Sequence, residues 1–128
     1  MADFATVLEA KVTGEPGRYT FTVKIASPDT GCDRYADWWE VISPEGELLY
    51  RRILAHSHVD EQPFARSGGP VPVQPDQPIL IRAHMNEQGY GNQVLQGTVA
   101  AGFTSVTLAN PPAPDLASQL PLPRGCEF

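Results

Sequence analysis

Proline and glycine recur so often along this chain that long helices have no room to form between them. The 128 residues include 13 prolines and 11 glycines, and turn signals recur at a spacing of roughly ten residues. This regular spacing of turn residues argues against a helical bundle and is typical of an antiparallel sandwich or barrel. We therefore expect an all-β fold with about seven or eight short strands.

The strongest strand prediction is the segment from Arg18 to Ser27, where apolar and other residues alternate. Successive side chains of a strand point to opposite faces, so this segment has one apolar face. Proline cannot donate a ladder hydrogen bond, which predicts a loop or broken edge strand over 63–78. The other predicted strands are 4–12, 37–42, 47–55, 79–85, 93–101 and 103–108.

The chain divides into two parts, a β-sandwich domain over residues 1–110 and a proline-rich C-terminal tail over 111–128. A free proline-rich end is usually disordered unless something holds it. We expect the apolar side chains of the tail to contact the domain or a second copy, and these are Leu116, Leu120, Leu122 and Phe128.

The charge balance limits the partners. The net charge is -6, and Lys11 and Lys24 are the only lysines, which predicts no binding to nucleic acid or to an anionic membrane. The N-terminal segment has neither the basic nor the apolar region of a secretory signal. We expect a cytoplasmic protein, in which Cys32 and Cys126 are free thiols; a disulfide between them is the alternative.

The histidines offer a possible metal site. His56 and His58 are two residues apart at the end of a predicted strand, so they share a face if the strand continues. His84 falls on the outward side of 79–85 if the apolar residues there point inward. Three imidazoles with Glu61 as a further ligand would suit zinc or a similar metal.

A binding surface is the other prediction for the same region. Trp38 and Trp39 are adjacent, so in a strand they face opposite ways. One fills the core, and the other is covered by packing or forms a stacking platform. Aromatic rings beside guanidinium groups suit a protein or a small acidic ligand, and guanidinium charge also disfavours a bound cation. The candidate ligand-binding residues are Trp39, Tyr50, Arg52, Arg82 and Tyr90.

The segment from Pro78 to Asn92, PILIRAHMNEQGYGN, resembles the sixth strand and following loop of fibronectin type III domains. Segments 18–27 and 37–42 fall where the second and third strands of that family lie, although its early tryptophan has no counterpart before Trp38. The resemblance implies an antiparallel immunoglobulin-like β-sandwich. Because such domains mostly bind or space other molecules, it also implies a non-enzymatic binding or protein-interaction module without a cofactor.

A second resemblance supports an alternative function. His56, His58, Glu61 and Gly68 are similar to the first motif of cupins, which are metal-binding barrels. The gap between histidine and glutamate is shorter here, and His84 lacks the preceding glycine of that family. This resemblance implies a metal-binding protein or a small cupin-like metal-dependent enzyme.

Overall fold

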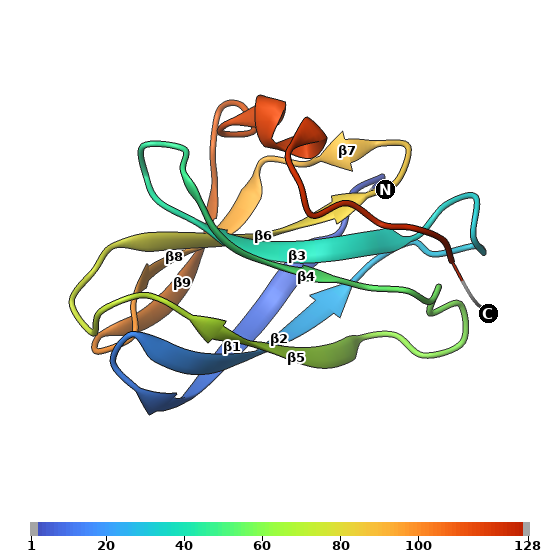
Figure 1. The fold of residues 1–128 in the computed structure, drawn as a ribbon. Helices are drawn as coiled ribbons and strands as arrows, with labels where there is room; N and C mark the ends of the chain where they lie inside the picture. Colours follow the sequence, from blue (N-terminus) through green and yellow to red (C-terminus); the bar gives the residue numbers. More distant parts are fainter. Residues whose placement is uncertain (1–2, 127–128) are drawn as a thin grey trace.

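The computed structural model describes residues 3–126 as two antiparallel sheets packed face to face (Figure 1). The all-β prediction is confirmed. The smaller sheet has the order β1-β2-β5, and its strands are β1 (Thr6–Glu15), β2 (Arg18–Ala26) and β5 (Phe64–Val71). The larger sheet has the order β4-β3-β6-β8-β9, with β7 (Gly89–Tyr90) paired to β6. Its main strands are β4 (Leu48–Ile53), β3 (Ala36–Ile42), β6 (Ile79–Met85), β8 (Gln93–Thr98) and β9 (Gly102–Thr107).

Local sequence accounts for the first hairpin. Pro16 and Gly17 form the turn between β1 and β2, and Gly17 has a φ of 81°. Proline presets the φ angle of the first central turn residue, and glycine accepts the positive φ of the second. In β2 the alternation holds as predicted, because Tyr19, Phe21 and Val23 are buried between the sheets.

The segment 63–78 contains an edge strand, one of the two predicted outcomes, but the strand is longer and more regular than predicted. It contains β5, a regular strand of eight residues at the edge of the smaller sheet. Pro70 lies next to the end of this strand, and an edge strand tolerates proline because one of its sides needs no ladder hydrogen bond.

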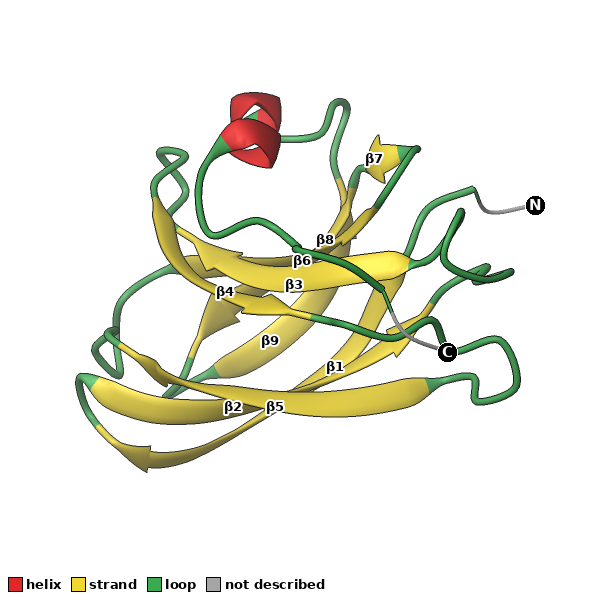
Figure 2. Ribbon diagram, turned by 45° about the vertical axis from the view of Figure 1, so that its right-hand side comes forward, coloured by secondary structure: helices red, strands yellow, loops and turns green. Residues whose placement is uncertain are grey.

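The central strands of the larger sheet are buried on both faces. All seven residues of β3 and all seven of β6 are buried. Their inner face, turned toward the smaller sheet, carries apolar side chains such as Trp39 and Ile81 that lie in the main core. The opposite face, here called the outer face, is covered by the C-terminal tail (Figure 2).

The tail crosses the outer face as an extended segment with one short 3₁₀ helix, η1 (Pro114–Ser118). Leu116 is buried in a second apolar cluster with Ile42, Leu80 and Val94. This confirms the predicted contact for Leu116. Leu120 is 76% exposed, so it does not pack against the domain, and its predicted contact with a second copy stays a prediction. Leu122 is half-buried, and Phe128 lies outside the described residues.

Candidate functional site

A buried ionic cluster occupies the centre of the outer face. Glu40 of β3 is opposite Arg51 of β4 on one side and Arg82 of β6 on the other. Its carboxylate accepts from Arg51 Nε at 2.7 Å and from Arg82 Nε at 2.8 Å. These side chains are at most 1% exposed. Two guanidinium groups against one carboxylate leave the cluster with an excess positive charge.

The arginine pair, Arg51 and Arg82, binds the main chain of the tail. Arg51 donates to the carbonyl oxygens of Leu116 at 2.7 Å, Gln119 at 2.5 Å and Pro121 at 2.9 Å. Arg82 donates to the carbonyls of Pro112 and Ala113. Because proline has no N–H group, a proline-rich segment offers more carbonyl acceptors than donors. The arginine pair therefore supplies hydrogen-bond donors that the tail itself lacks; the carbonyls of Ala113 and Leu116 also accept from the N–H groups of Leu116 and Gln119 within the tail.

Aromatic rings flank the arginine pair. The guanidinium carbon of Arg51 lies 4.1 Å from the ring centre of Trp38, and that of Arg82 lies 3.5 Å from the ring centre of Tyr90. These are cation–π distances. Burial and the nearby Glu40 carboxylate raise the pKa of Tyr90, so its hydroxyl stays protonated.

His84 also belongs to this face. Its ring stacks on Trp38 with 3.7 Å between centres, and its Nδ1 lies 2.7 Å from Oδ1 of Asp37. The side chain of His84 is 10% exposed, so both contacts are made in the interior of the molecule. The ring of His84 therefore packs against one face of the Trp38 indole and is held there by Asp37.

The structure does not bring the predicted ligand-binding residues onto one surface. Trp39 is fully buried in the main core, with the ring of Tyr50 5.7 Å away. Arg52 donates to the carbonyl of Ser67 in β5 and so links the edges of the two sheets. Arg82 and Tyr90 instead lie on the outer face beneath the tail. Arg82 and His84 lie on the outward side of β6, as predicted, but both are buried there, Arg82 beneath the tail.

The three histidines are also separated. Strand β4 ends at Ile53, so strand alternation does not place His56 and His58 on one face. His56 is exposed, whereas His58 is buried, and His84 lies on the outer face. Within residues 3–126, no three His, Cys, Asp or Glu side chains are arranged to hold a metal ion.

His58 anchors the loop between β4 and β5. Its ring stacks on Phe64 at 3.8 Å, and its Nε2 lies 2.7 Å from an Nη of Arg66. Arginine is always a donor, so Nε2 accepts and Nδ1 carries the proton. Burial and the charge of Arg66 lower the pKa of His58, which keeps the ring neutral.

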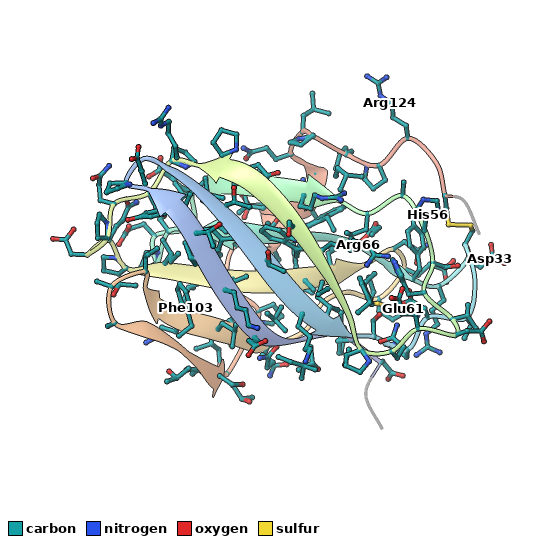
Figure 3. The ribbon with its side chains drawn as sticks, turned by 90° about the horizontal axis from the view of Figure 1, so that it is seen from below. Asp33, His56, Glu61, Arg66, Phe103 and Arg124 are labelled. Carbon is teal, nitrogen blue, oxygen red and sulfur yellow. A yellow bond between two sulfur atoms is a disulfide. The ribbon has the colours of Figure 1, made fainter. Side chains whose placement is uncertain are left out.

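Glu61 lies beside this loop rather than beside a second histidine. Its carboxylate is 3.5 Å from Arg66 and the side chain of Glu61 is 62% exposed. Figure 3 shows His56, Glu61 and Arg66 at the end of the sandwich that also carries the disulfide. The Asp29 carboxylate accepts from the backbone N–H of His58 at 2.8 Å and fixes the loop against the start of β3.

The sequence reasoning missed Glu40, Arg51, Asp29 and Asp37. In a strand with alternating residues, the polar face is expected to be in contact with water. The sequence of β3 alone does not show whether the Glu40 carboxylate is solvated or covered by the tail. A usable signal existed: oppositely charged residues sit at the centres of three strands in a chain that ends in a proline-rich segment. Such residues together indicate a covered face that must supply hydrogen-bond donors.

Comparison with known proteins gives one relative to consider. No protein-family model matches this chain, and no solved structure matches it. A protein of Halomicrobium mukohataei named "Putative lipoprotein" is 32% identical over 108 residues, which are 84% of this chain and 53% of that protein. The chain therefore spans about half the length of this curated relative.

These findings correct the expected location and the state of the cysteines. Cys32 and Cys126 form a disulfide, so the prediction of free thiols is wrong. Persistent disulfides are typical of oxidising compartments, and the relative bears the name of a lipoprotein. The prediction of a cytoplasmic protein is therefore wrong as well. Within residues 3–126, no helix is both long and apolar enough to cross a bilayer.

Proposed function

We propose that this chain is a non-enzymatic binding module of an exported protein, and that it holds extended proline-rich segments by their main-chain carbonyls. The observation that carries the proposal is the arginine pair, which donates to five carbonyl groups of the tail. The name of the relative and the disulfide support a location outside the cytoplasm, where lipid-anchored proteins display binding domains.

We also infer that the sandwich is immunoglobulin-like. The three-stranded order β1-β2-β5 and the neighbouring order β4-β3-β6-β8 support this. In that fold the first, second and fifth strands form one sheet, while the third, sixth and last form the other. Domains with this architecture carry binding surfaces more often than catalytic centres, which is an argument by analogy with the fold.

The donors of the binding face are preorganised. Glu40 holds both guanidinium groups through Nε, and its carboxylate also lies 2.7 Å from Nη2 of Arg51. In this orientation both arginines direct other N–H groups toward the tail. Fixing the donors before binding reduces the entropy lost on association. Trp38 and Tyr90 add aromatic surface, and aromatic-lined grooves are a recurring way to bind proline-rich extended segments. A ligand selected in this way is recognised by its backbone and its extended shape rather than by particular side chains.

The tail of the chain occupies this face as an internal ligand. A partner segment would have to displace it, and the disulfide between Cys32 and Cys126 opposes displacement by tethering the tail. Beside the start of the tail, a hollow of about 410 Å³ lies among Pro44, Leu80 and Pro112. A side chain of a partner segment could enter this space, which the side chains of the tail leave unfilled.

The test uses a chain that ends at Asn110 and carries Cys32→Ser, to which a synthetic peptide of residues 111–125 is added. Truncation should lower the melting temperature, because Leu116 and the carbonyl contacts are lost. The peptide should restore it and produce a saturable change in tryptophan fluorescence. A peptide of the same composition in scrambled order is the control.

A second variant of the full chain tests the proposal even if the truncated chain does not fold. In the full chain with Cys32→Ser and Cys126→Ser, a fluorescently labelled tail peptide should compete with the untethered tail and bind. Arg82→Met should weaken this binding at least tenfold, since two carbonyl contacts are removed. Absence of peptide binding to both proteins would refute the proposal.

The location is tested separately in cells that express the native gene. The protein should be recovered outside the cytoplasm or with the membrane fraction. On a non-reducing gel, the tail should remain disulfide-linked after a cut in a surface loop. Recovery in the cytoplasm with both thiols free would contradict the exported location without bearing on the binding face.

A further inference from the structure

Strand β9 ends the larger sheet with an open side. It pairs with β8 alone, and just beyond it the N–H of Leu108 donates to the carbonyl of Asn92 at 2.8 Å. Because hydrogen-bonded residues alternate in an antiparallel pair, Phe103, Ser105 and Thr107 direct their main-chain groups away from β8. Within residues 3–126, no hydrogen bond to these outward groups is found.

The other sheet edges carry features that discourage pairing with another chain. Strand β1 has a bulge between Val7 and Glu9, and β5 contains Pro70. In β4, Arg51 and Arg52 are charged, and the tail lies beside Arg51. Proline, bulges and charged residues are the usual means of protecting a sheet edge. Strand β9 has none of them.

The region around β9 is also uncharged over an unusual length. No Asp, Glu, Lys, Arg or His occurs from Gln88 to Pro114, although the chain contains 15 acidic and 9 basic residues. With a net charge of -6, two copies repel each other over most of their surface. The repulsion between two copies is smallest where the β8–β9 hairpins face each other.

We infer that β9 pairs with β9 of a second copy, so that two larger sheets continue into one antiparallel sheet across a twofold axis. The outward main-chain groups restrict the register to shifts of two residues, and the register centred on Ser105 is the one that pairs all three outward residues with one another. Ser105 pairs with Ser105 of the second copy, and Phe103 pairs with Thr107 of the second copy. Any register shifted by one residue would set outward groups against groups already bonded to β8.

The side chains are compatible with this register. Thr104 lies opposite Val106 of the second copy on the outer face, and both are small enough to sit side by side in a sheet. On the inner side, a hollow of about 250 Å³ is lined by apolar residues that include Leu8, Val12 and Phe103, together with Glu9. Leu8 is 47% exposed. A strand added to β9 would lie along the open side of this hollow, near the labelled Phe103 in Figure 3.

Sedimentation equilibrium of the full chain at physiological salt is the first measurement. A concentration-dependent monomer–dimer equilibrium is expected. Thr104→Lys places like charges close together across the axis and should weaken dimerisation at least tenfold. Thr13→Lys is the matched control, because it makes the same charge change at an exposed position of β1 and should leave dimerisation unchanged.

Two further variants test the register. Ser105→Pro removes an outward N–H without removing a bond to β8, so it should abolish dimers while circular dichroism and the melting curve remain those of a folded sandwich. Ser105→Cys should give disulfide-linked dimers on mild oxidation, since hydrogen-bonded antiparallel partners have Cα atoms about 5.5 Å apart. A chain that remains monomeric at every concentration, or a dimer that tolerates Thr104→Lys and Ser105→Pro, would overturn the inference.

Discussion

Along β3 and β6 both faces of the larger sheet are buried, but their chemistry differs. On β3, Trp39 and Val41 point into an apolar core, whereas Trp38 and Glu40 point to the outer face. The inner face meets a second sheet whose main-chain groups are already paired. The outer face meets an irregular segment whose carbonyls need donors. The difference shows that the covering element decides whether a buried face must be apolar or must carry polar groups.

The largest expected effect comes from removing the carboxylate at the centre of the outer face. Glu40→Ala leaves two buried guanidinium groups without their counter-charge, which should cost about 3–5 kcal/mol in the free energy of unfolding. On the inner face, Ile81→Val should cost about 1 kcal/mol. Urea denaturation of both variants provides the comparison. Equal losses would mean that water reaches the arginine pair when the carboxylate is absent.

Cutting the tether of the outer face should have the next largest effect. The disulfide joins residues 94 positions apart, and closing so long a loop restricts the unfolded chain strongly. Cys32→Ser with Cys126→Ser should lower the free energy of unfolding by about 3 kcal/mol. The wild-type protein treated with dithiothreitol serves as control and should match the variant. If oxidised and reduced proteins unfold at the same urea concentration, the tether contributes nothing to stability.

Substitutions of two leucines of the tail measure the contribution of apolar packing alone, because neither side chain takes part in the carbonyl contacts. Leu116→Ala should lower the free energy of unfolding by about 2–3 kcal/mol, since this side chain is 4% exposed and packs in the apolar cluster of the outer face. Leu120→Ala is the matched control at 76% exposure and should change stability by less than about 0.5 kcal/mol. Thermal melts of the two variants measure the difference. A comparable loss at Leu120 would show that the tail is packed differently.

The smallest expected effect is the pH dependence of stability caused by His58, which is buried as a neutral group, unlike the buried ionic groups of the outer face. Burial and the charge of Arg66 lower the pKa of His58, so the folded protein binds this proton less readily than the unfolded chain, whose histidine titrates near about 6.5. Stability should therefore be unaffected above that pH and fall as the pH drops below it. The slope is at most about 1.4 kcal/mol per pH unit.

Replacement of the histidine checks this assignment. His58→Gln should remove the slope from stability curves measured between about pH 5 and 7, whereas His56→Gln should retain it because His56 is exposed. A slope that survives in His58→Gln would assign the titration to another group.

The central strands of the two sheets, β2 and β6, were predictable because their apolar alternation is strong. The prediction for 79–85 coincides with β6, and the buried side of β2 follows directly from Tyr19, Phe21 and Val23. Strand β5 was harder to predict. Its Gly-Gly-Pro sequence weakens the local signal, and the pairing with β2 that stabilises it is a contact distant in sequence.

The candidate site was less predictable for a related reason. Sequence placed Arg82 and His84 on the face away from the core, which is where they lie, but solvent was expected there instead of the tail. Arg51 was not singled out, because its role depends on carbonyls about 65 to 70 residues later in the chain. The prediction that His56 and His58 share a face failed because β4 ends at Ile53. Strand alternation therefore does not apply to the two histidines.

The disulfide also has a mechanical consequence. A force that pulls on the C-terminus reaches the loop before β3 through Cys32, and the hydrogen bonds between the arginine pair and the tail carry none of it. Everything between residues 32 and 126 is enclosed in one covalent ring. Only β1 and β2, which precede Cys32, can be drawn out by tension applied at both ends. In a protein stretched between an anchor and a partner, tension would therefore extend β1 and β2, whereas the segment enclosed by the disulfide could not be drawn out.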